Sequence, residues 1–487
     1  MVLAVWAAVS LPAALGAVAL ARPAATWTRH AAAAAAAAVL VSGLVLLGHG
    51  AAVTTSAGGL LRVDALSAYL LTVVGAVAVV ATWSTATERP NGRFSALMCL
   101  FLTAMSLAVL ADSLGLLWVA IEATTITTAF LVAHGGRRHA LEAAWKYVIL
   151  GSVGVAIAFL GIVILYAATG DHATLSWVAL TGGSPLALGP ARAGLALAAL
   201  GLATKAGLAP MHSWLPDAHS QAPAQVSALM SGVLLSVAFY AILRLKAISD
   251  LVLGPDLMRT LLTIAALLSL TVAAALMLTQ RNYKRLLAYS SIEHMGIIAL
   301  GAAIGGPLAT TAVLLHILGH GLAKATLFVV SGRVLRATGT HEIAGVRALL
   351  TRQPSLARPW LAGTAALLGF PPFSLFLTET AIIVAGYQRG MAAPTSIALV
   401  LLMVVFAGFT RHTVAMTLGT YAGAPGRAET PGPSDETDRD DAVTDPSTRG
   451  QRRVTTLALV AVAALVPLAW PLRDVLLAAA RTLGVTS

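Results

Sequence analysis

The chain has 487 residues, of which 58% are hydrophobic and only 10% are charged. Soluble domains usually carry about 25% charged residues, so lipid must be the main solvent of this chain, which has no water-soluble catalytic domain. Its single cysteine, Cys99, excludes an intrachain disulfide framework and any cysteine-ligated cluster built from this chain alone. The formal net charge of +11 indicates basic cytoplasmic loops of a membrane protein, not nucleic-acid binding.

Runs of about 20 mostly apolar residues, the length that a helix needs to cross a bilayer, recur along the whole chain. They predict an all-α polytopic membrane protein with about fourteen transmembrane helices. The first run precedes Arg22 and Arg29, so we interpret it as a spanning helix and not as a signal peptide, whose basic residues come first. The expected spans are 2–21, 31–49, 64–84, 94–111, 114–133, 143–169, 191–210, 223–246, 258–279, 286–304, 308–335, 358–388, 394–420 and 454–479.

Basic residues are concentrated in alternate loops, which the positive-inside rule assigns to the cytoplasm. Both chain termini are then predicted to lie outside the cell membrane. The polar stretch 424–453 is rich in Pro, Asp, Thr and Arg, and we expect a disordered cytoplasmic loop there. The basic residues that set this orientation are Arg22, Arg29, Arg89, Arg93, Arg137, Arg138, Arg281, Lys284, Arg285, Arg333, Arg336, Arg347, Arg352, Arg427, Arg439, Arg449, Arg452 and Arg453.

Proline interrupts two of the predicted helices. The span 191–210 ends at Ala209-Pro210, and the span 358–388 is broken near its middle by Pro371-Pro372. Each is the fourth helix of a set of five, which predicts two inverted repeats with an ion site at each break. Ordinary proline kinks are the alternative. The predicted units are three N-terminal helices (1–93), the repeats 94–248 and 249–423, the loop 424–453 and a C-terminal helix (454–487).

Charged residues inside the predicted spans are the candidate functional residues, because a charge at membrane depth costs roughly 2.5–3.5 kcal/mol. Glu122 lies mid-span, and Lys205 precedes the first break. A buried lysine can release its proton, whereas an arginine effectively cannot. We therefore expect Glu122 and Lys205 to form a coupled pair. The alternatives are a glutamate that only bridges helices and a static salt bridge.

His316, His320 and Lys324 recur every fourth residue, so they share one face of the span 308–335. Because histidine exchanges protons near neutral pH, this spacing predicts a proton relay. One of the histidines could instead be hydrogen-bonded in the core. The HxxxH spacing also suits metal ligands, but neither a second cysteine nor an HExxH motif accompanies it, so we expect no metal site.

Glu379, seven residues after Pro372, repeats the pattern in the second half, with an interfacial glutamate as the alternative. Among the accessory candidates, Lys146 could simply pair with Glu142 along one helix. The turn after the first break could be a proton entrance or a solvated loop. The accessory candidates are Glu293, His294, Lys146, Asp217, His212 and His219.

Several of these stretches resemble the antiporter-like membrane subunits of respiratory complex I, Mrp-type cation/proton antiporters and energy-converting hydrogenases. They are KAGLAPMHSWLPDAHSQAPAQVSALMSG, QRNYKRLLAYSSIEHMGI and HILGHGLAKATLF. The stretches SLGLLWVAIEATT, LEAAWKYVILGSVG and SSIEHMG look most similar to the component F type of hydrogenase-4 and formate hydrogenlyase. The resemblance covers about 94–415, most of the chain.

The resemblance implies that Glu122 and Lys205 are the coupled pair and that Glu379 ends a relay through His316, His320 and Lys324. Many relatives carry another lysine where this chain has Ser236. Since serine cannot store a proton, the central link would run through water or the histidines.

Together these observations predict a proton-translocating, non-catalytic subunit of an NADH:quinone oxidoreductase-like or hydrogenase complex. Its partners would be other membrane and peripheral subunits, which would carry the redox cofactors, since we expect no cofactor in this chain. It would contact lipid and protons, or Na⁺, and no nucleic acid. The alternatives are an Mrp-type Na⁺/H⁺ antiporter subunit, an ion-coupled partner of inorganic-carbon uptake machinery, and a structural membrane anchor.

Overall fold

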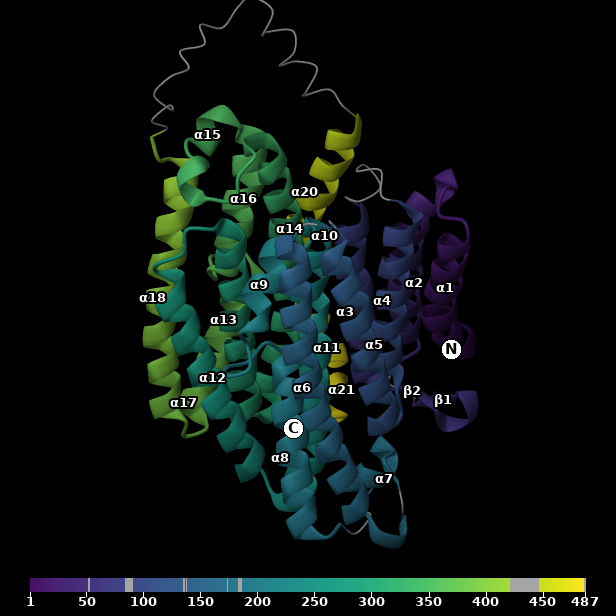
Figure 1. The fold of residues 1–487 in the computed structure, drawn as a ribbon. Coiled ribbons are helices and arrows are strands. Elements are labelled where there is room, and N and C mark those ends of the chain that lie inside the picture. The colour runs from purple at the N-terminus through teal and green to yellow at the C-terminus, as the bar shows by residue number, and fades with distance from the viewer. Residues whose placement is uncertain are drawn as a thin grey trace, which may run out of the picture.

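The computed structural model describes residues 1–50, 53–83, 91–134, 136, 138–172, 174–182, 186–420 and 446–485. Figure 1 shows helices standing side by side in a slab, from α1 at one edge to α17 and α18 at the other. The helices and strands are α1 (Val2–Ala21), α2 (Ala31–Gly48), β1 (Thr54–Ser56), β2 (Leu61–Val63), α3 (Ala65–Trp83), α4 (Gly92–Leu110), α5 (Leu114–Ala133), α6 (Arg138–Ala168), α7 (Trp177–Thr181), α8 (Leu188–Lys205), α9 (Trp214–Gln221), α10 (Ala224–Leu229), α11 (Leu235–Leu253), α12 (Asp256–Met277), α13 (Tyr283–Ile304), α14 (Gly306–Thr338), α15 (Leu349–Arg352), α16 (Pro354–Leu367), α17 (Ser374–Gln388), α18 (Ala392–Thr417), α20 (Pro446–Leu468) and α21 (Arg473–Arg481).

The prediction of a polytopic helical membrane protein is confirmed. Among the described residues, eleven helices are long and apolar enough to cross a bilayer, or twelve if the bent pair α20 and α21 forms one more span. The other predicted spans, 191–210 and 358–388, fall on α8 and on the interrupted pair α16 and α17. The predicted count of fourteen therefore stays a prediction, because it depends on how interrupted helices are counted.

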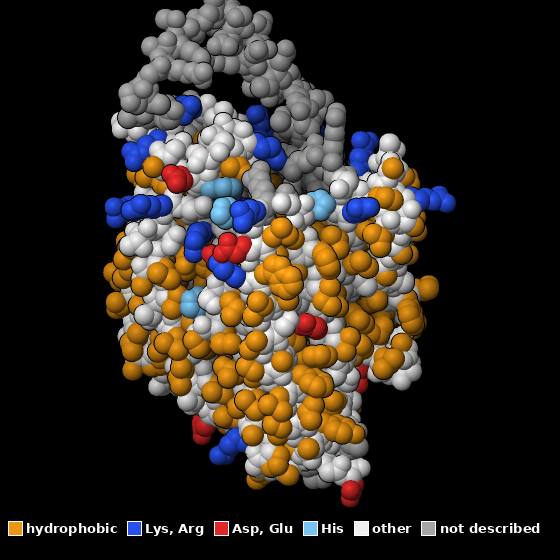
Figure 2. Space-filling model, in the orientation of Figure 1, with side chains coloured by type: hydrophobic (Ala, Val, Ile, Leu, Met, Phe, Trp, Pro, Cys, Tyr) orange, Lys and Arg blue, Asp and Glu red, His pale blue; other side chains and the backbone are white. Residues whose placement is uncertain are grey.

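The predicted loop 424–453 lies largely outside the described residues. Its last part, 446–453, begins α20. Figure 2 shows Lys and Arg side chains gathered towards the end that carries this helix start, with mainly hydrophobic side chains over the middle. Both chain ends lie towards the opposite end in Figure 1. The distribution of charge thus follows the alternation of basic loops in the sequence.

The core lies where the innermost helices meet. The segments 224–253 and α13 are buried along their whole apolar windows, and α14 nearly so. By contrast, α1, α6, α12 and α18 expose much of their apolar surface, as helices that face lipid do. Met230–Leu234, between α10 and α11, is a π-helical segment. Ionisable residues on the inner helices are therefore shielded from lipid.

Small residues bring α6 and α8 into close contact. A Cβ added at Gly161 would lie 2.3 Å from the backbone nitrogen of Ala198, and one at Gly201 would lie 2.3 Å from that of Ala158. Side chains at these positions would force the helices apart, so glycine sets their separation. This contact places α8 directly beside the face of α6 that points into the bundle.

Both predicted breaks are present, and neighbouring side chains satisfy backbone groups at the first. After α8, the Trp214 indole donates to the carbonyl oxygen of Thr204 (2.8 Å), and the Ala209 amide donates to the Ser269 hydroxyl (2.9 Å). Between α16 and α17, Gly369 has a φ of +63°, a conformation that favours glycine. These backbone groups of the first break are therefore bonded to protein, as membrane burial of backbone groups requires.

A buried ion pair fixes the end of the bundle near the β1–β2 hairpin. Asp64 precedes α3, where it accepts a hydrogen bond from the Ser67 amide (2.9 Å) and bonds at 2.8 and 2.6 Å from Arg244 of α11. Burial alone would raise the pKa of Asp64, but the Arg244 guanidinium and the Ser67 amide outweigh it and hold the pKa below its ordinary value. Arg244 also donates to the Tyr240 hydroxyl (3.1 Å). The network ties α3 to α11.

Candidate functional site

Glu122 lies on α5 and points towards α6. Its carboxylate accepts hydrogen bonds from the hydroxyls of Thr125 on the same helix and Ser152 on α6, both at 3.2 Å. The side chain is only partly buried. These hydroxyls hold the carboxylate where α5 faces α6, so Glu122 is a membrane-embedded acid with neutral partners.

Lys205, the last residue of α8, is fully buried. Its Nζ donates to the Tyr147 hydroxyl at 3.2 Å and lies 4.4 Å from the centre of that ring, close enough for a cation–π contact. Among the described residues, no ion pair within 4 Å joins Lys205 to Glu122. Each residue of the expected pair thus has its own neutral partners, Tyr147 for Lys205 and the hydroxyls of Thr125 and Ser152 for Glu122.

A second cluster is centred on three buried histidines. His294 of α13 and His316 of α14 face each other, with His294 Nδ1 3.2 Å from His316 Nε2. The ring centre of His320 lies 4.9 Å from that of His294, and neither of its ring nitrogens has a hydrogen-bond partner among the described residues. The three rings form one continuous group of proton-binding side chains.

Thr378 of α17 contacts the outer side of the His316 ring. The Thr378 hydroxyl lies 2.9 Å from His316 Nδ1 and 3.0 Å from the carbonyl oxygen of Leu375, and its one proton can go to either. On the far side of His294, Nε2 lies 3.5 Å from the Glu293 carboxylate, without a hydrogen bond among the described residues. A file of proton-binding groups therefore runs from Glu293 through both imidazoles to Thr378.

Lys324, two turns along α14 from His316, is fully buried. Its Nζ donates to the carbonyl oxygen of Leu287 at 2.8 Å and to the hydroxyl of Ser290. Both partners belong to α13, so α13 and α14 together enclose the ammonium group. Like Lys205, it has neutral oxygen partners and not a direct carboxylate.

Glu379 of α17 reaches back to the helix break. A Cβ added at Gly369 would lie 2.7 Å from Glu379 Oε2, so the glycine leaves room for the carboxylate. Glu379 and Glu293 both line a cavity of about 360 Å³ between α13, α16, α17 and α18. The ligand atoms of His294, His316 and Glu379 lie within 4.8 Å of one another. The second break thus borders the histidine cluster.

A third group lies at the end of α6 that carries the basic residues. Lys146 pairs with Glu142 (2.7 Å) and, at 3.5 Å, with Asp217 of α9, which also pairs with Arg285 of α13 (3.2 Å). These side chains are partly exposed, and the expected pair of Lys146 and Glu142 is present. Asp217 therefore connects three helices at one end of the bundle.

The other accessory candidates differ in burial. His212 lies in the first break and is partly buried. His219 is fully buried on α9 and stacks on Phe328 of α14, with ring centres 5.1 Å apart, so a solvated loop does not describe it. Ser236 is buried on α11 and donates weakly to the carbonyl oxygen of Gly232 (3.4 Å). Of these two buried residues, His219 and not Ser236 carries a titratable group.

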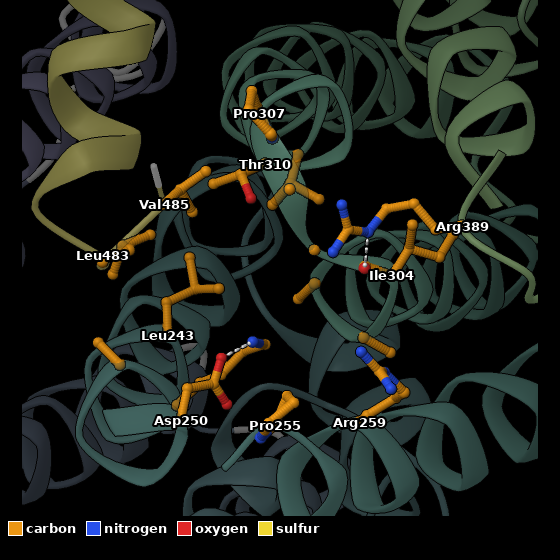
Figure 3. Close-up of a pocket in the computed structure, with 18 of the residues that line it drawn as sticks. Leu243, Asp250, Pro255, Arg259, Ile304, Pro307, Thr310, Arg389, Leu483 and Val485 are labelled. Carbon is orange, nitrogen blue, oxygen red and sulfur yellow. Dashed lines mark hydrogen bonds and ion pairs between the residues drawn. The ribbon is translucent and has the colours of Figure 1, made fainter. Parts of the chain in front are cut away.

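A cavity of about 390 Å³ opens at the ends of α11, α13 and α14 (Figure 3). Lys246 and Asp250 form an ion pair in its lining, Arg259 projects from α12, and Arg389 donates to the carbonyl oxygen of Ile304 (3.1 Å). This end of the bundle, opposite to the basic loops, thus carries a cavity lined partly by charged side chains.

Comparison with known proteins assigns a family to this arrangement. The model of the NADH:quinone oxidoreductase/Mrp antiporter transmembrane family matches residues 111–410, more than half of the chain, and this segment contains both charged clusters. The chain belongs to this family. Within the family, the hydrogenase-4 component F homolog of Methylacidiphilum infernorum is 39% identical over 293 residues, which are 58% of this chain and 61% of that protein. The chain spans about three fifths of the length of the curated relatives it matches.

Solved structures show how far the family fold extends. A chain of the archaeal membrane-bound sulfane sulfur reductase, a respiratory membrane complex, superposes with a TM-score of 0.87 at 22% identity, covering 100% of this chain and 98% of its own. A chain of the Mrp complex from Dietzia sp. DQ12-45-1b superposes with a TM-score of 0.84 at 21% identity, covering 99% and 98%. At such identities the likeness establishes the fold alone.

Sequence reasoning missed the neutral residues that hold the charged ones. Tyr147, Thr378 and Ser290 carry no charge, so a search for charges in apolar spans passes over them. The sequence does contain a signal for one of them. Tyr147, Gly151 and Gly154 lie at helical spacing on one face of the predicted span 143–169, and the two glycines on that face indicate a close helix contact with room for a side chain of the neighbouring helix.

Proposed function

We propose that this chain is a proton-translocating membrane subunit of a larger, redox-driven complex of the hydrogenase-4 or complex I type. One observation carries the proposal: each helix break borders a cluster of buried titratable groups held by neutral hydroxyls and carbonyls. Charged residues at membrane depth are costly and are usually retained for ion transfer. Family membership and the likeness to subunits of multi-subunit membrane complexes support the proposal.

In the proposed path, Glu122 and Lys205 form the first proton-transfer unit. The Tyr147 hydroxyl, 3.2 Å from Lys205 Nζ, can accept a hydrogen bond from the lysine and donate one to water on the Glu122 side. The file of Glu293, His294 and His316 forms the second unit. A proton that enters such a file at one end is released at the other when each imidazole exchanges its tautomer.

Lys324, His320 and Glu379 complete the second unit. In the proposed path, Lys324 is the member of the second unit nearest the first unit. Glu379 is the last member, where the cavity between α16, α17 and α18 reaches the surface. Many relatives carry a lysine at the position of Ser236. In this chain, buried His219 and water would take the place of that lysine between the two units. Redox chemistry would take place in partner subunits.

The finer architecture belongs to the same proposal. Counting α8 with α9, α16 with α17, and α20 with α21 as one interrupted span each brings the eleven regular spans to about fourteen. The repeats 94–248 and 249–423 then each carry a glutamate on the second helix, partly buried Glu122 and buried Glu293, and a break in the fourth. With the basic end in the cytoplasm, both termini lie outside the cell membrane.

The decisive experiment replaces Glu122 by Gln, which keeps the side-chain volume and can keep the bonds from Thr125 and Ser152. Proton uptake would be measured in inverted vesicles and normalised to the amount of assembled complex. We expect Glu122→Gln to abolish coupled uptake, and Glu142→Gln, which alters an exposed acid on the adjacent helix, to leave it unchanged. Uptake at the parental rate in Glu122→Gln would refute the proposal.

The histidine file is tested in the same assay with His316→Gln and His320→Gln. Glutamine keeps hydrogen bonding but cannot titrate. Normal uptake in both variants would favour a structural membrane anchor over a transporter.

A second candidate function is Na⁺/H⁺ antiport. Its supporting observation is the pair of carboxylates, Glu293 and Glu379, that line one cavity, since oxygen ligands suit hard cations. The fold is also shared with a subunit of an Mrp complex. Proton movement that requires Na⁺ and needs no electron donor would select this function.

A further inference from the structure

We propose that His294, His316 and Glu379 form a binding site for a divalent transition-metal ion of the Zn²⁺ type, where α13, α14 and α17 meet. From the sequence we expected no metal site, because neither a second cysteine nor an HExxH motif accompanies the HxxxH spacing on α14. The structure instead pairs one of these histidines with a histidine from α13 and a carboxylate from α17. All three offer ligand atoms within 4.8 Å of one another.

The spacing of the two imidazoles suits tetrahedral coordination. His294 Nδ1 and His316 Nε2 lie 3.2 Å apart. Zn–N bonds of about 2.0–2.1 Å at tetrahedral angles place two nitrogen ligands about 3.3 Å apart, so the separation of the two nitrogens need hardly change, and the rings would turn to aim both lone pairs at the ion. The partly exposed Glu379 side chain can swing closer by rotation about its own bonds. Two nitrogens and one carboxylate are a donor set that zinc prefers, whereas Na⁺, Mg²⁺ and Ca²⁺ prefer oxygen.

The outer nitrogen of each histidine lies near an oxygen of the kind that orients metal-bound histidines. His316 Nδ1 and the Thr378 hydroxyl are hydrogen-bonded at 2.9 Å, and His294 Nε2 lies 3.5 Å from the Glu293 carboxylate, without a hydrogen bond among the described residues. Ligating histidines characteristically donate their second N–H to such a carboxylate or oxygen, which orients the ring and raises its basicity. Thr378 and Glu293 are therefore placed to support the two histidines as ligands.

Charge and access also suit a divalent ion. The carboxylates of Glu293 and Glu379 together can neutralise the two positive charges of the ion. The ammonium group of Lys324 on α14, which is bonded to Ser290, would repel the ion. Both carboxylates line the cavity of about 360 Å³, through which an ion could reach the histidines. Beside them lies His320, fully buried with both ring nitrogens unpartnered among the described residues.

Metal binding would displace the proton that His294 and His316 share between Nδ1 and Nε2. The ion would hold the lone pairs of His294 Nδ1 and His316 Nε2. For both rings to stay neutral, the displaced proton must be taken up by whichever outer nitrogen lacks one, so that His316 carries its proton on Nδ1 and His294 on Nε2. Because tautomer exchange would then be impossible, the metal would block the histidine file. This inhibitory part rests on the proposed function, whereas the binding part depends only on the geometry.

The binding test uses Co²⁺, whose visible absorption reports tetrahedral coordination. The chain is purified with its partner subunits, without a histidine tag, and titrated with Co²⁺ and then with Zn²⁺. We expect one equivalent of tetrahedral Co²⁺ that Zn²⁺ displaces. His294→Gln, His316→Gln and Glu379→Gln should each weaken binding by at least about tenfold, the lower end of what even second-shell changes cost.

His219→Gln is the matched control, because it alters a buried histidine outside the site and should leave the Co²⁺ spectrum unchanged. Absence of the tetrahedral spectrum from the parental protein would overturn the proposal without any variant. An equal spectrum in all four variants would also overturn it, since the ion would then bind elsewhere. Zn²⁺ is next added to vesicles that take up protons. Zn²⁺ that binds at this site without inhibiting uptake would leave the metal site standing and refute the histidine file.

Discussion

Gly151→Ala should separate proton transfer from stability, because this glycine lies against the end of a functional side chain. An added Cβ would be 2.8 Å from Lys205 Nζ and 3.5 Å from its Cε, while the next neighbour, Thr125 Cγ2, is at 3.7 Å. The ammonium group must retreat by about 0.6 Å to reach an ordinary contact distance. A movement of that size away from Tyr147 would lengthen the 3.2 Å bond to its hydroxyl beyond hydrogen-bonding range.

The expected effects on transport and stability differ in size. A hydrogen bond to a charged group contributes about 1.5–3 kcal/mol. Each 1.4 kcal/mol is a factor of ten. The fraction of molecules in which Lys205 is bonded to the Tyr147 hydroxyl should therefore fall by about 10- to 100-fold, and the rate of proton uptake should fall by the same factor. Stability should change little, because only the flexible end of a lysine moves and alanine favours the helix by about 1 kcal/mol over glycine.

The assay is proton uptake in inverted vesicles together with the thermal stability of the assembled complex. Gly115→Ala is the neutral control, since its Cβ would meet only Leu175 Cδ1 at 3.8 Å. Gly161→Ala is the packing control, which should lose assembly because its Cβ would meet backbone at 2.3 Å. If Gly151→Ala takes up protons as fast as Gly115→Ala, the position of Lys205 does not matter and the reasoning fails.

Two further predictions concern Ser236 and Asp64. We expect Ser236→Lys to assemble and to keep or raise proton uptake relative to Ser236→Ala, because it supplies the titratable group that the central link lacks; failure to assemble would indicate a dry, tightly packed position. Asp64→Asn should destabilise the protein by about 3–5 kcal/mol, because it leaves Arg244 buried without its charge partner. Since the pKa of Asp64 is held below its ordinary value of 3.8, the parental protein should keep this stabilisation above that pH and lose it as the pH falls further, whereas the melting temperature of Asp64→Asn should lack this acid-dependent loss.

Hydropathy and proline placement were enough to predict most of the spans and both breaks, because they depend on residues close in the sequence. The charged residues of the site were also predictable, since a lysine such as Lys205 stands out in an apolar run. Their partners were not: the bond between Tyr147 and Lys205 joins residues 58 positions apart, and the bond between His316 and Thr378 joins residues 62 apart. Which neutral hydroxyl meets which charge depends on how the helices pack against each other, and no local pattern encodes that.

The expected coupling of Glu122 and Lys205 stays a prediction. Their direct hydrogen-bond partners are neutral and could not be read from the sequence: Lys205 donates to Tyr147, and Glu122 accepts from Ser152. The His294 contact was missed as a central feature because the histidine spacing on α14 drew attention to one helix alone.

The π-helical segment Met230–Leu234 has a consequence for the alignment of the two halves of the molecule. A π turn closes its hydrogen bond over one residue more than an α turn, and each residue of an α-helix rotates the chain by about 100°. A regular α-helix through this sequence would therefore turn α10 by that amount relative to α11, and Ser231 would leave the Ser291 hydroxyl that it now contacts at 2.8 Å. Deleting a single residue here would remove the extra residue of the π turn, so a regular α-helix could form with α10 and α11 still facing their present neighbours. Chain length at this one turn, and not hydrophobicity, sets which neighbours α10 faces.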